Sequence, residues 1–156
     1  MNTKPQMILV AGPYRSGTND DPVKIAANVA AMTEASLALF RAGHLPMMGE
    51  WFALPLIEHA GGRQIGDAVF DEIFHPVSRR LVAKCDAVLR IGGASAGADE
   101  MVALGREHGK AIYFSITDIS APSNTPKAST FSFRPTRKTL ALTIESSQLL
   151  PPAFAD

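Results

Sequence analysis

The sequence predicts an α/β fold built on a mainly parallel sheet of four to five strands, with helices packed on it. Short, continuous apolar runs alternate with segments of helical periodicity along residues 7–116. Two of these runs lead directly into glycine-bearing loops, at residues 12–17 and 92–97. Regular alternation of this kind is typical of parallel strands joined by right-handed crossover helices. We therefore expect a doubly wound sheet with a crevice at its carboxyl edge.

The first strand and the first helix are expected within residues 7–43. Residues 7–11 (MILVA) are uniformly apolar and are followed by Gly-Pro, which favours a strand covered on both faces. Asp20, Asp21 and Pro22 then form a helix start signal, and apolar residues recur at helical spacing until Gly43. A long helix packed on the sheet follows from this pattern.

The middle of the chain predicts a second strand, a short helix and a second longer helix. Residues 45–48 have the composition of a short strand, and residues 52–60 that of a helix broken by Pro55. A proline disfavours helical geometry in the residue before it. We therefore expect the next regular helix to begin near His75 or Pro76 and to end at Lys84.

Two further strands and one helix are expected before residue 120. Residues 87–91 predict the third strand, residues 98–108 the helix behind the second glycine loop, and residues 111–115 the fourth strand. Gly109 supplies the stop signal for that helix.

The chain divides by composition into an α/β domain at residues 1–119 and a C-terminal extension at residues 120–156. The extension is rich in Pro, Ser, Thr, Lys and Arg as far as residue 137, which is typical of a loop or an arm. Residues 139–150 have the composition of either a strand or an amphipathic helix. We expect this element at the sheet edge or in a subunit contact.

Composition argues against several classes of partner. Fifteen basic residues balance fifteen acidic ones among 156, so no overall field draws the chain to a nucleic acid or an anionic membrane. Cys85 is the single cysteine, which excludes an internal disulfide, and residues 1–6 lack the layout of a signal peptide. No apolar stretch approaches the ~20 residues that a membrane span needs. A cytoplasmic protein that binds a small molecule is expected.

The first glycine loop offers a candidate binding site. It carries Gly12, Tyr14, Arg15 and Ser16, whose side chains and backbone donors suit a phosphate, a carboxylate or a sugar hydroxyl. The loop lacks the spacing of a Walker loop or of a dinucleotide fingerprint. The alternative is a tight turn from strand to helix in which Arg15 is only solvated.

The second glycine loop contains Ser95 and Gly97 and leads into two carboxylates, Asp99 and Glu100. Acidic side chains complement the dipole in the first turn of a helix without any catalytic duty, which is the alternative explanation. Glu50 and Trp51 leave the second strand toward the same rim of the sheet. We therefore expect all of these residues to face one crevice.

The four histidines have no metal-ligand spacing, so a zinc site is not expected. His75 alone stands near a helix start that faces the predicted crevice. Cys85 has no obvious catalytic partner and is interpreted as a structural thiol.

Several segments, in order and spacing, resemble the nucleoside 2-deoxyribosyltransferase superfamily over residues 7–116. They are Ala11-Gly12-Pro13-Tyr14, Gly43-His44, Cys85-Asp86-Ala87-Val88, Ser95-Ala96-Gly97-Ala98-Asp99 and Gly109-Lys110. The resemblance implies a flavodoxin-like sheet, a dimer or larger homo-oligomer, and cleavage or transfer of the N-glycosidic bond of a nucleoside or nucleoside monophosphate. It implies neither a metal nor an organic cofactor.

The resemblance also implies a catalytic carboxylate at the start of the helix after the second loop. In many relatives the glutamate stands where this chain has Met101, and an aspartate of the preceding helix stands where it has Ser78. Glu100 is the first choice for the nucleophile, with Asp99 as a second catalytic candidate or a helix cap, and Glu50 as a substitute carboxylate or a ligand for a sugar hydroxyl. The alternative is a non-catalytic module that binds a nucleotide or a nucleotide sugar.

Overall fold

Four parallel strands form a sheet in the order β2-β1-β3-β4 in the computed structural model, which describes residues 4–122. The strands are β1 (Met7–Ala11), β2 (Leu45–Met47), β3 (Ala87–Arg90) and β4 (Ala111–Tyr113). This order is that of the flavodoxin-like sheet. The predicted α/β fold with a parallel sheet is confirmed.

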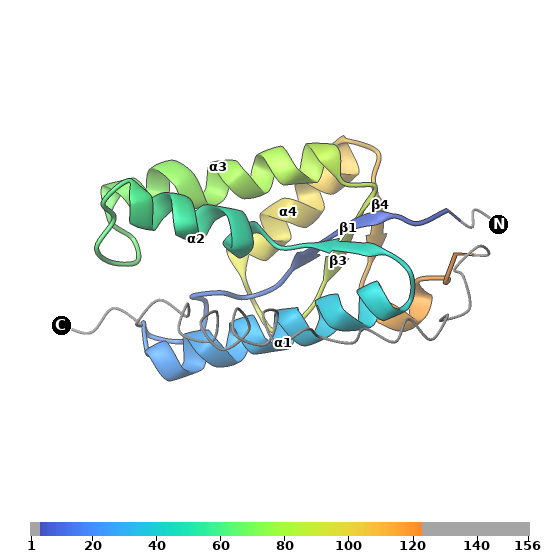
Figure 1. The fold of residues 1–156 in the computed structure, drawn as a ribbon, viewed down its shortest axis with the longest axis horizontal. Coiled ribbons are helices and arrows are strands. Elements are labelled where there is room, and N and C mark those ends of the chain that lie inside the picture. The colour runs from blue at the N-terminus through green and yellow to red at the C-terminus, as the bar shows by residue number, and fades with distance from the viewer. Residues whose placement is uncertain (1–3, 123–156) are drawn as a thin grey trace, which may run out of the picture. The chain divides into compact units, whose positions relative to one another are not determined.

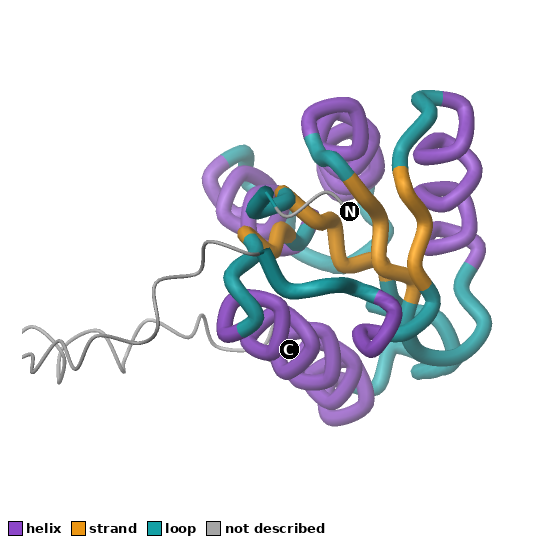
Figure 2. The backbone as a smooth tube through the Cα atoms, turned by 90° about the vertical axis from the view of Figure 1, so that its right-hand side faces the viewer, coloured by secondary structure: helices purple, strands orange, loops and turns teal. Residues whose placement is uncertain are grey.

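Helices cover both faces of the sheet. They are α1 (Pro22–Arg41), α2 (Gly49–His59), α3 (Ala68–Lys84) and α4 (Ala96–Glu107), and a short 3₁₀ helix, η1 (Ile116–Asp118), follows β4. Figure 1 shows α1 on one side of the strands and α3 and α4, with α2 beside α3, on the other. The strands lie between these helices in Figure 2. The chain is therefore doubly wound.

The core has two parts because successive side chains of a strand point to opposite faces. Ile8 and Val10 of β1 pack in one cluster with Met32 and Leu39 of α1. The alternate residues of β1 and β3 pack against α3 and α4 in a second cluster, with Leu9, Ala11, Val82, Val88, Ala98, Met101 and Val102 as members. The uniformly apolar composition of residues 7–11 reflects this double burial.

α3 begins eight residues before the predicted start near Pro76. Asp67 caps the helix: its Oδ1 accepts the N–H of Phe70 at 2.8 Å, and its Oδ2 accepts the N–H of Arg63 at 2.8 Å. Phe70 then stacks on Phe74, with ring centroids 4.5 Å apart. The cap and the stacked rings stabilise the turns that precede Pro76, so the proline lies inside the helix rather than at its start.

α2 also differs from the prediction, since it begins at Gly49 and continues through Pro55 to His59. Ala53 and Ile57 of this helix are buried with Phe70 of α3. Packing between α2 and α3 therefore outweighs the hydrogen bond that the proline cannot donate. The predicted element at residues 139–150, and most of the predicted extension, lie outside the described residues.

One helix among the described residues, α1, is long and apolar enough to cross a membrane by length and composition. Its 20 residues include an 18-residue window of mean hydropathy 1.3, which corrects the expectation that no apolar stretch approaches this length. The core helix of a soluble protein passes the same test, so this is weak evidence for a membrane segment. Ile25, Met32 and Leu39 place one face of α1 in the core of the sheet.

His44 connects the start of β1 with the segment that follows η1. Its side chain is buried, its Nδ1 accepts the N–H of Gln6 at 3.2 Å, and its Nε2 lies 3.1 Å from the carbonyl oxygen of Ser120. Since Nδ1 accepts a hydrogen bond, the proton of the neutral ring is on Nε2, which donates to Ser120. One side chain thus satisfies two backbone groups at the amino edge of the sheet.

We expect His44→Ala to lower the free energy of unfolding by about 2–3 kcal/mol, because it removes two hydrogen bonds and the packing of a buried side chain. Urea unfolding followed by circular dichroism measures this change. His59→Ala, which truncates an exposed histidine at the end of α2, is the matched control and should cost only a few tenths of a kcal/mol. Equal losses in the two variants would contradict the role assigned to His44.

Candidate functional site

A cavity of about 290 Å³ opens at the carboxyl ends of β1 and β3, between the two glycine loops and helices α2, α3 and α4. β1 and β3 are neighbours in the sheet, although the crossovers that follow them run to opposite edges. This point, where the strand order reverses, is where open α/β sheets bind their ligands. The volume lies just below the range of roughly 300–1,000 Å³ that is typical of small-molecule sites.

Most of the predicted binding residues line this cavity, and three predicted residues do not. The predicted residues in its wall are Gly12, Tyr14, Arg15, Ser16, Glu50, Ser95 and Gly97. Trp51, Asp99 and Glu100 are absent from the wall. Twelve further residues, which the sequence did not identify as binding residues, complete it: Leu9, Val10, Ala11, Gly49, Phe70, Asp71, Phe74, His75, Ser78, Ala96, Ala98 and Met101.

The two glycine loops meet because their glycines carry no side chain. A Cβ on Gly12 would lie 2.9 Å from Cγ of Met32, and a Cβ on Gly92, whose φ is +75°, would lie 2.7 Å from Cδ of Pro13. The hydroxyl of Ser16 donates to that of Ser95 at 3.3 Å across the junction. These glycines therefore permit close packing of the loops, a role that accompanies any approach to an anion.

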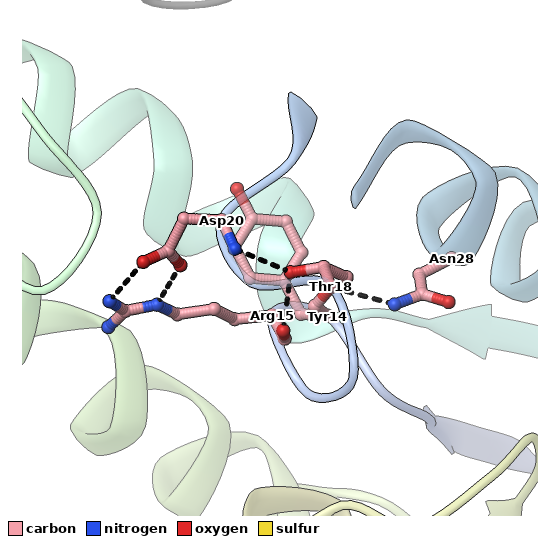
Figure 3. A network of polar contacts seen from close by, with 5 residues as sticks. All are labelled: Tyr14, Arg15, Thr18, Asp20 and Asn28. Atoms are coloured by element: carbon pink, nitrogen blue, oxygen red, sulfur yellow. Dashed lines mark hydrogen bonds and ion pairs between the residues drawn. The ribbon is translucent and has the colours of Figure 1, made fainter. Parts of the chain in front are cut away.

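The first loop is held by side chains that sequence reasoning missed (Figure 3). The buried Thr18 donates its hydroxyl hydrogen to the carbonyl oxygen of Arg15 at 2.6 Å and accepts the N–H of Asp20 at 3.2 Å. Asn28 of α1 donates to the carbonyl oxygen of Tyr14 at 2.9 Å. Asp20 has a φ of +60°, a conformation that aspartate tolerates better than most residues. The loop is thus fixed before any ligand binds.

Arg15 forms a two-point ion pair with Asp20 at the mouth of the cavity. Its Nε and Nη2 contact the two carboxylate oxygens, the second at 2.8 Å. The hydrogen bond from Arg15 lowers the pKa of Asp20, while both side chains stay about half exposed. The guanidinium also lies against Gly66, where a Cβ would be 2.6 Å from Nη1. The side chain of Arg15 is therefore held in one orientation in the cavity wall rather than merely solvated.

Aromatic rings form one wall of the cavity. The ring of Tyr14 lies 5.1 Å from that of Phe74 and 6.4 Å from that of Phe70, measured between centroids. Phe70 and Phe74 occupy positions i and i+4 of α3, so they present their rings on one face of the helix. Sequence analysis missed them because it placed the start of α3 after both.

Glu50 is a buried carboxylate in the cavity wall, with 8% of its surface exposed. It stands in the first turn of α2. Burial raises its pKa, against a smaller opposing effect from a hydrogen bond to its own backbone amide. Burial and the charge of Glu50 together raise the pKa of Tyr14. These two groups therefore interact electrostatically within the cavity.

The start of α4 presents Met101, and neither Asp99 nor Glu100, to the cavity. One residue along a helix corresponds to about 100° of rotation, so adjacent positions face different neighbours. Asp99 accepts a hydrogen bond from Nε of Arg90 at 2.8 Å, and Glu100 accepts one from Nε of Arg79 at 2.7 Å. Both predicted catalytic carboxylates are thus engaged in ion pairs outside the cavity wall.

Arg90 pairs with Asp99 and also contacts the backbone of the second glycine loop. The guanidinium donates to the carbonyl oxygens of Ile91 and Gly93, the latter at 2.7 Å. These bonds fix the backbone of the second glycine loop, and Asp99 neutralises the cation that makes them. Ser95 caps α4 by accepting the N–H of Ala98 at 3.3 Å. Asp99 therefore supports the loop, while Ser95 both caps the helix and lines the cavity.

The titratable residues of the described part of the chain offer no metal site. Within residues 4–122, no group of three or more His, Cys, Asp or Glu side chains is placed to hold a metal ion. Cys85 is fully buried at the end of α3, and burial raises the pKa of its thiol to about 11. The thiolate that nucleophilic chemistry needs is therefore scarce at neutral pH.

Comparison with known proteins adds no family to this geometry. No protein-family model matches the chain, and no curated protein matches its sequence.

We expect Glu50→Gln to raise the melting temperature at pH 7, because the folded state pays to bury the ionised carboxylate. The pKa of Glu50 is raised in the folded state. The contribution of its protonated form to stability is therefore fully present below the unfolded pKa and is lost as the pH rises through the folded pKa. The advantage of the variant should therefore shrink between pH 7 and pH 4 in calorimetric scans. Glu58→Gln, on an exposed position of the same helix, should show no such dependence. A constant difference across this range would refute the burial argument.

Proposed function

We propose that the cavity binds a nucleoside or nucleoside 5′-monophosphate and that the protein hydrolyses or transfers its N-glycosidic bond, with Glu50 as the carboxylate at the sugar. The proposal rests above all on the placement of Glu50 as a buried carboxylate among hydroxyl, aromatic and glycine-loop residues at the strand-order reversal of the sheet. The resemblance of the loop motifs to the nucleoside 2-deoxyribosyltransferase superfamily supports the same chemistry.

The cavity offers complementary surfaces for the parts of such a ligand. Tyr14, Phe70 and Phe74 supply rings against which a flat base can stack. The hydroxyls of Ser16, Ser78 and Ser95 can bond to sugar or phosphate oxygens. Ala96 and Gly97, at the amino end of α4, add the positive end of a helix dipole.

Glu50 is proposed to attack the anomeric carbon in its ionised form. A carboxylate oxygen bonds to C1′ as the bond from C1′ to the base nitrogen breaks, and the base leaves with that electron pair and takes up a proton. Water or a second base then attacks C1′ and releases Glu50. The transition state carries positive charge near C1′, and a carboxylate in a site of low dielectric constant stabilises that charge strongly.

A second candidate function is ligand binding without turnover. Met101 and Ser78 line the cavity at the positions where the resemblance implies carboxylates. Neither a thioether nor a lone serine hydroxyl replaces such a carboxylate. If Glu50 only accepts a hydrogen bond from the sugar, the protein is a nucleotide-binding module, and calorimetry with the same ligands detects binding without product.

We expect purified protein to release free base from at least one member of a panel of ribo- and deoxyribonucleosides and their 5′-monophosphates, measured by chromatography. Glu50→Gln should reduce kcat by about a hundredfold or more while ligand affinity changes little. Glu58→Gln is the control and should match wild type. Binding without product in wild type would reject catalysis in favour of the binding module, and neither binding nor product would reject both.

We expect Arg15→Gln to weaken binding of a 5′-monophosphate by roughly tenfold or more while leaving the matching nucleoside unaffected. Charged hydrogen bonds to phosphate are worth about 1.5–3 kcal/mol, and Arg15 stands at the mouth of the cavity. Titration calorimetry with the two ligands measures the ratio. Arg41→Gln, at the far end of α1, controls for loss of net charge. An equal effect on both ligands would exclude a phosphate contact.

A further inference from the structure

We infer that His75 is the acid–base residue of this site and that Glu100, held by Arg79, is its positioning residue. The inference rests on the proposed function, since it names the group that carries the proton in N-glycosidic cleavage. It assigns a role to Glu100 that differs from the nucleophile the motif resemblance implied.

His75 belongs to α3 and lies in the cavity wall, with its ring near the start of α4. Its ring meets the ring of Phe74 edge-on, with centroids 5.6 Å apart and an interplanar angle of 83°. A Cβ on Gly97 would lie 3.3 Å from Cε1 of His75. The absence of a side chain at Gly97 therefore lets the imidazole pack against the second glycine loop, where a ligand would bind.

The carboxylate of Glu100 lies near the Nδ1 edge of the same ring. Its Oε1 accepts the hydrogen bond from Nε of Arg79, and its Oε2 lies 3.9 Å from Nδ1 of His75. Arg79 follows His75 by one helical turn of α3, so the ion pair fixes the carboxylate beside the imidazole. Because the carboxylate lies on the Nδ1 side of the ring, Nε2 is the nitrogen left to exchange protons with the ligand. No described residue forms a hydrogen bond with Nε2 of His75.

The proton transfers balance in two steps. In the first, the imidazolium gives its Nε2 proton to the departing base while Glu50 bonds to C1′ and the bond from C1′ to nitrogen breaks. In the second, neutral Nε2 takes a proton from water while the water oxygen bonds to C1′ and the ester to Glu50 breaks. The histidine ends as it began, protonated, and the carboxylate is free again.

The charged groups around His75 come from four elements. Glu100 of α4 and Arg79 of α3 form the pair described above, and Asp71 stands one turn before His75 on α3. Glu50 of α2 and Arg15 of the first loop line the same cavity. The charges of all these groups act on His75 together.

The leaving base provides the sharpest test. We expect His75→Gln to lower kcat at least a hundredfold on a purine substrate but less than about threefold on its N7-methylated counterpart, because a cationic base departs without a proton. Rates are corrected for spontaneous hydrolysis. His59→Gln is the control and should leave both substrates unchanged. Equal losses on the two substrates would overturn the acid role of His75.

The positioning role of Glu100 has two readouts. Glu100→Ala should lower kcat on the unmethylated substrate by roughly tenfold with KM unchanged, whereas Glu107→Ala, at the exposed end of the same helix, should have no effect. Long-range ¹H–¹⁵N NMR spectra report which ring nitrogen of His75 carries the proton. We expect the Nδ1–H form in wild type and its decrease in Glu100→Ala, and an unchanged spectrum would overturn the positioning role.

The two proposals fail in different ways. If wild type releases no base from either substrate, the proposed function fails and the catalytic role of His75 fails with it. If wild type is active and His75→Gln is equally active on both substrates, only the inference about His75 is wrong. The NMR measurement needs no substrate, so it tests the contact between Glu100 and His75 in either case.

Discussion

The close approach of the loops after β1 and β3 is the constraint on which the site depends. These strands are hydrogen-bonded neighbours, so their carboxyl ends emerge side by side. The loops can turn toward α1 and α4 without collision because Gly12 and Gly92 present no Cβ to Met32 and Pro13. The hydrogen bond from Ser16 to Ser95 closes the junction. The residues of the cavity wall lie around this junction between the two loops.

The sheet was predictable from sequence because its determinants are local. A strand buried on both faces must be apolar at every position, and residues 7–11 satisfy this rule within five residues. The alternation of strands and helices predicts parallel strands joined by right-handed crossovers, but it does not fix the order of the strands. The start of α3 was missed because it depends on the cap at Asp67 and on rings brought together by tertiary packing, which outweigh the local signal of Pro76.

The site could be predicted only in part, because the sequence does not show which positions of a helix face the cavity. Loop positions at strand ends converge whatever their side chains, and Tyr14, Arg15, Ser16 and Ser95 lie together in the wall of one cavity. On α4, however, neighbouring positions differ by about 100°, and sequence cannot tell which of them faces inward without knowing where the helix begins. The partners of the outward carboxylates, Arg79 and Arg90, come from other elements of the fold and have no signature beside Asp99 or Glu100.

The contacts of the buried histidine at the amino edge of the sheet limit how short an expressed fragment of this domain can be. His44 donates to the carbonyl of Ser120, and Ile119 is buried in the core beside α1. The composition of the chain changes at residue 120, yet the carbonyl group of that same residue is the hydrogen-bond partner of His44. An expressed fragment that stopped at residue 119 would leave the imidazole without its acceptor and put a chain terminus beside the core. The smallest fragment that keeps these contacts intact therefore extends beyond the compositional border.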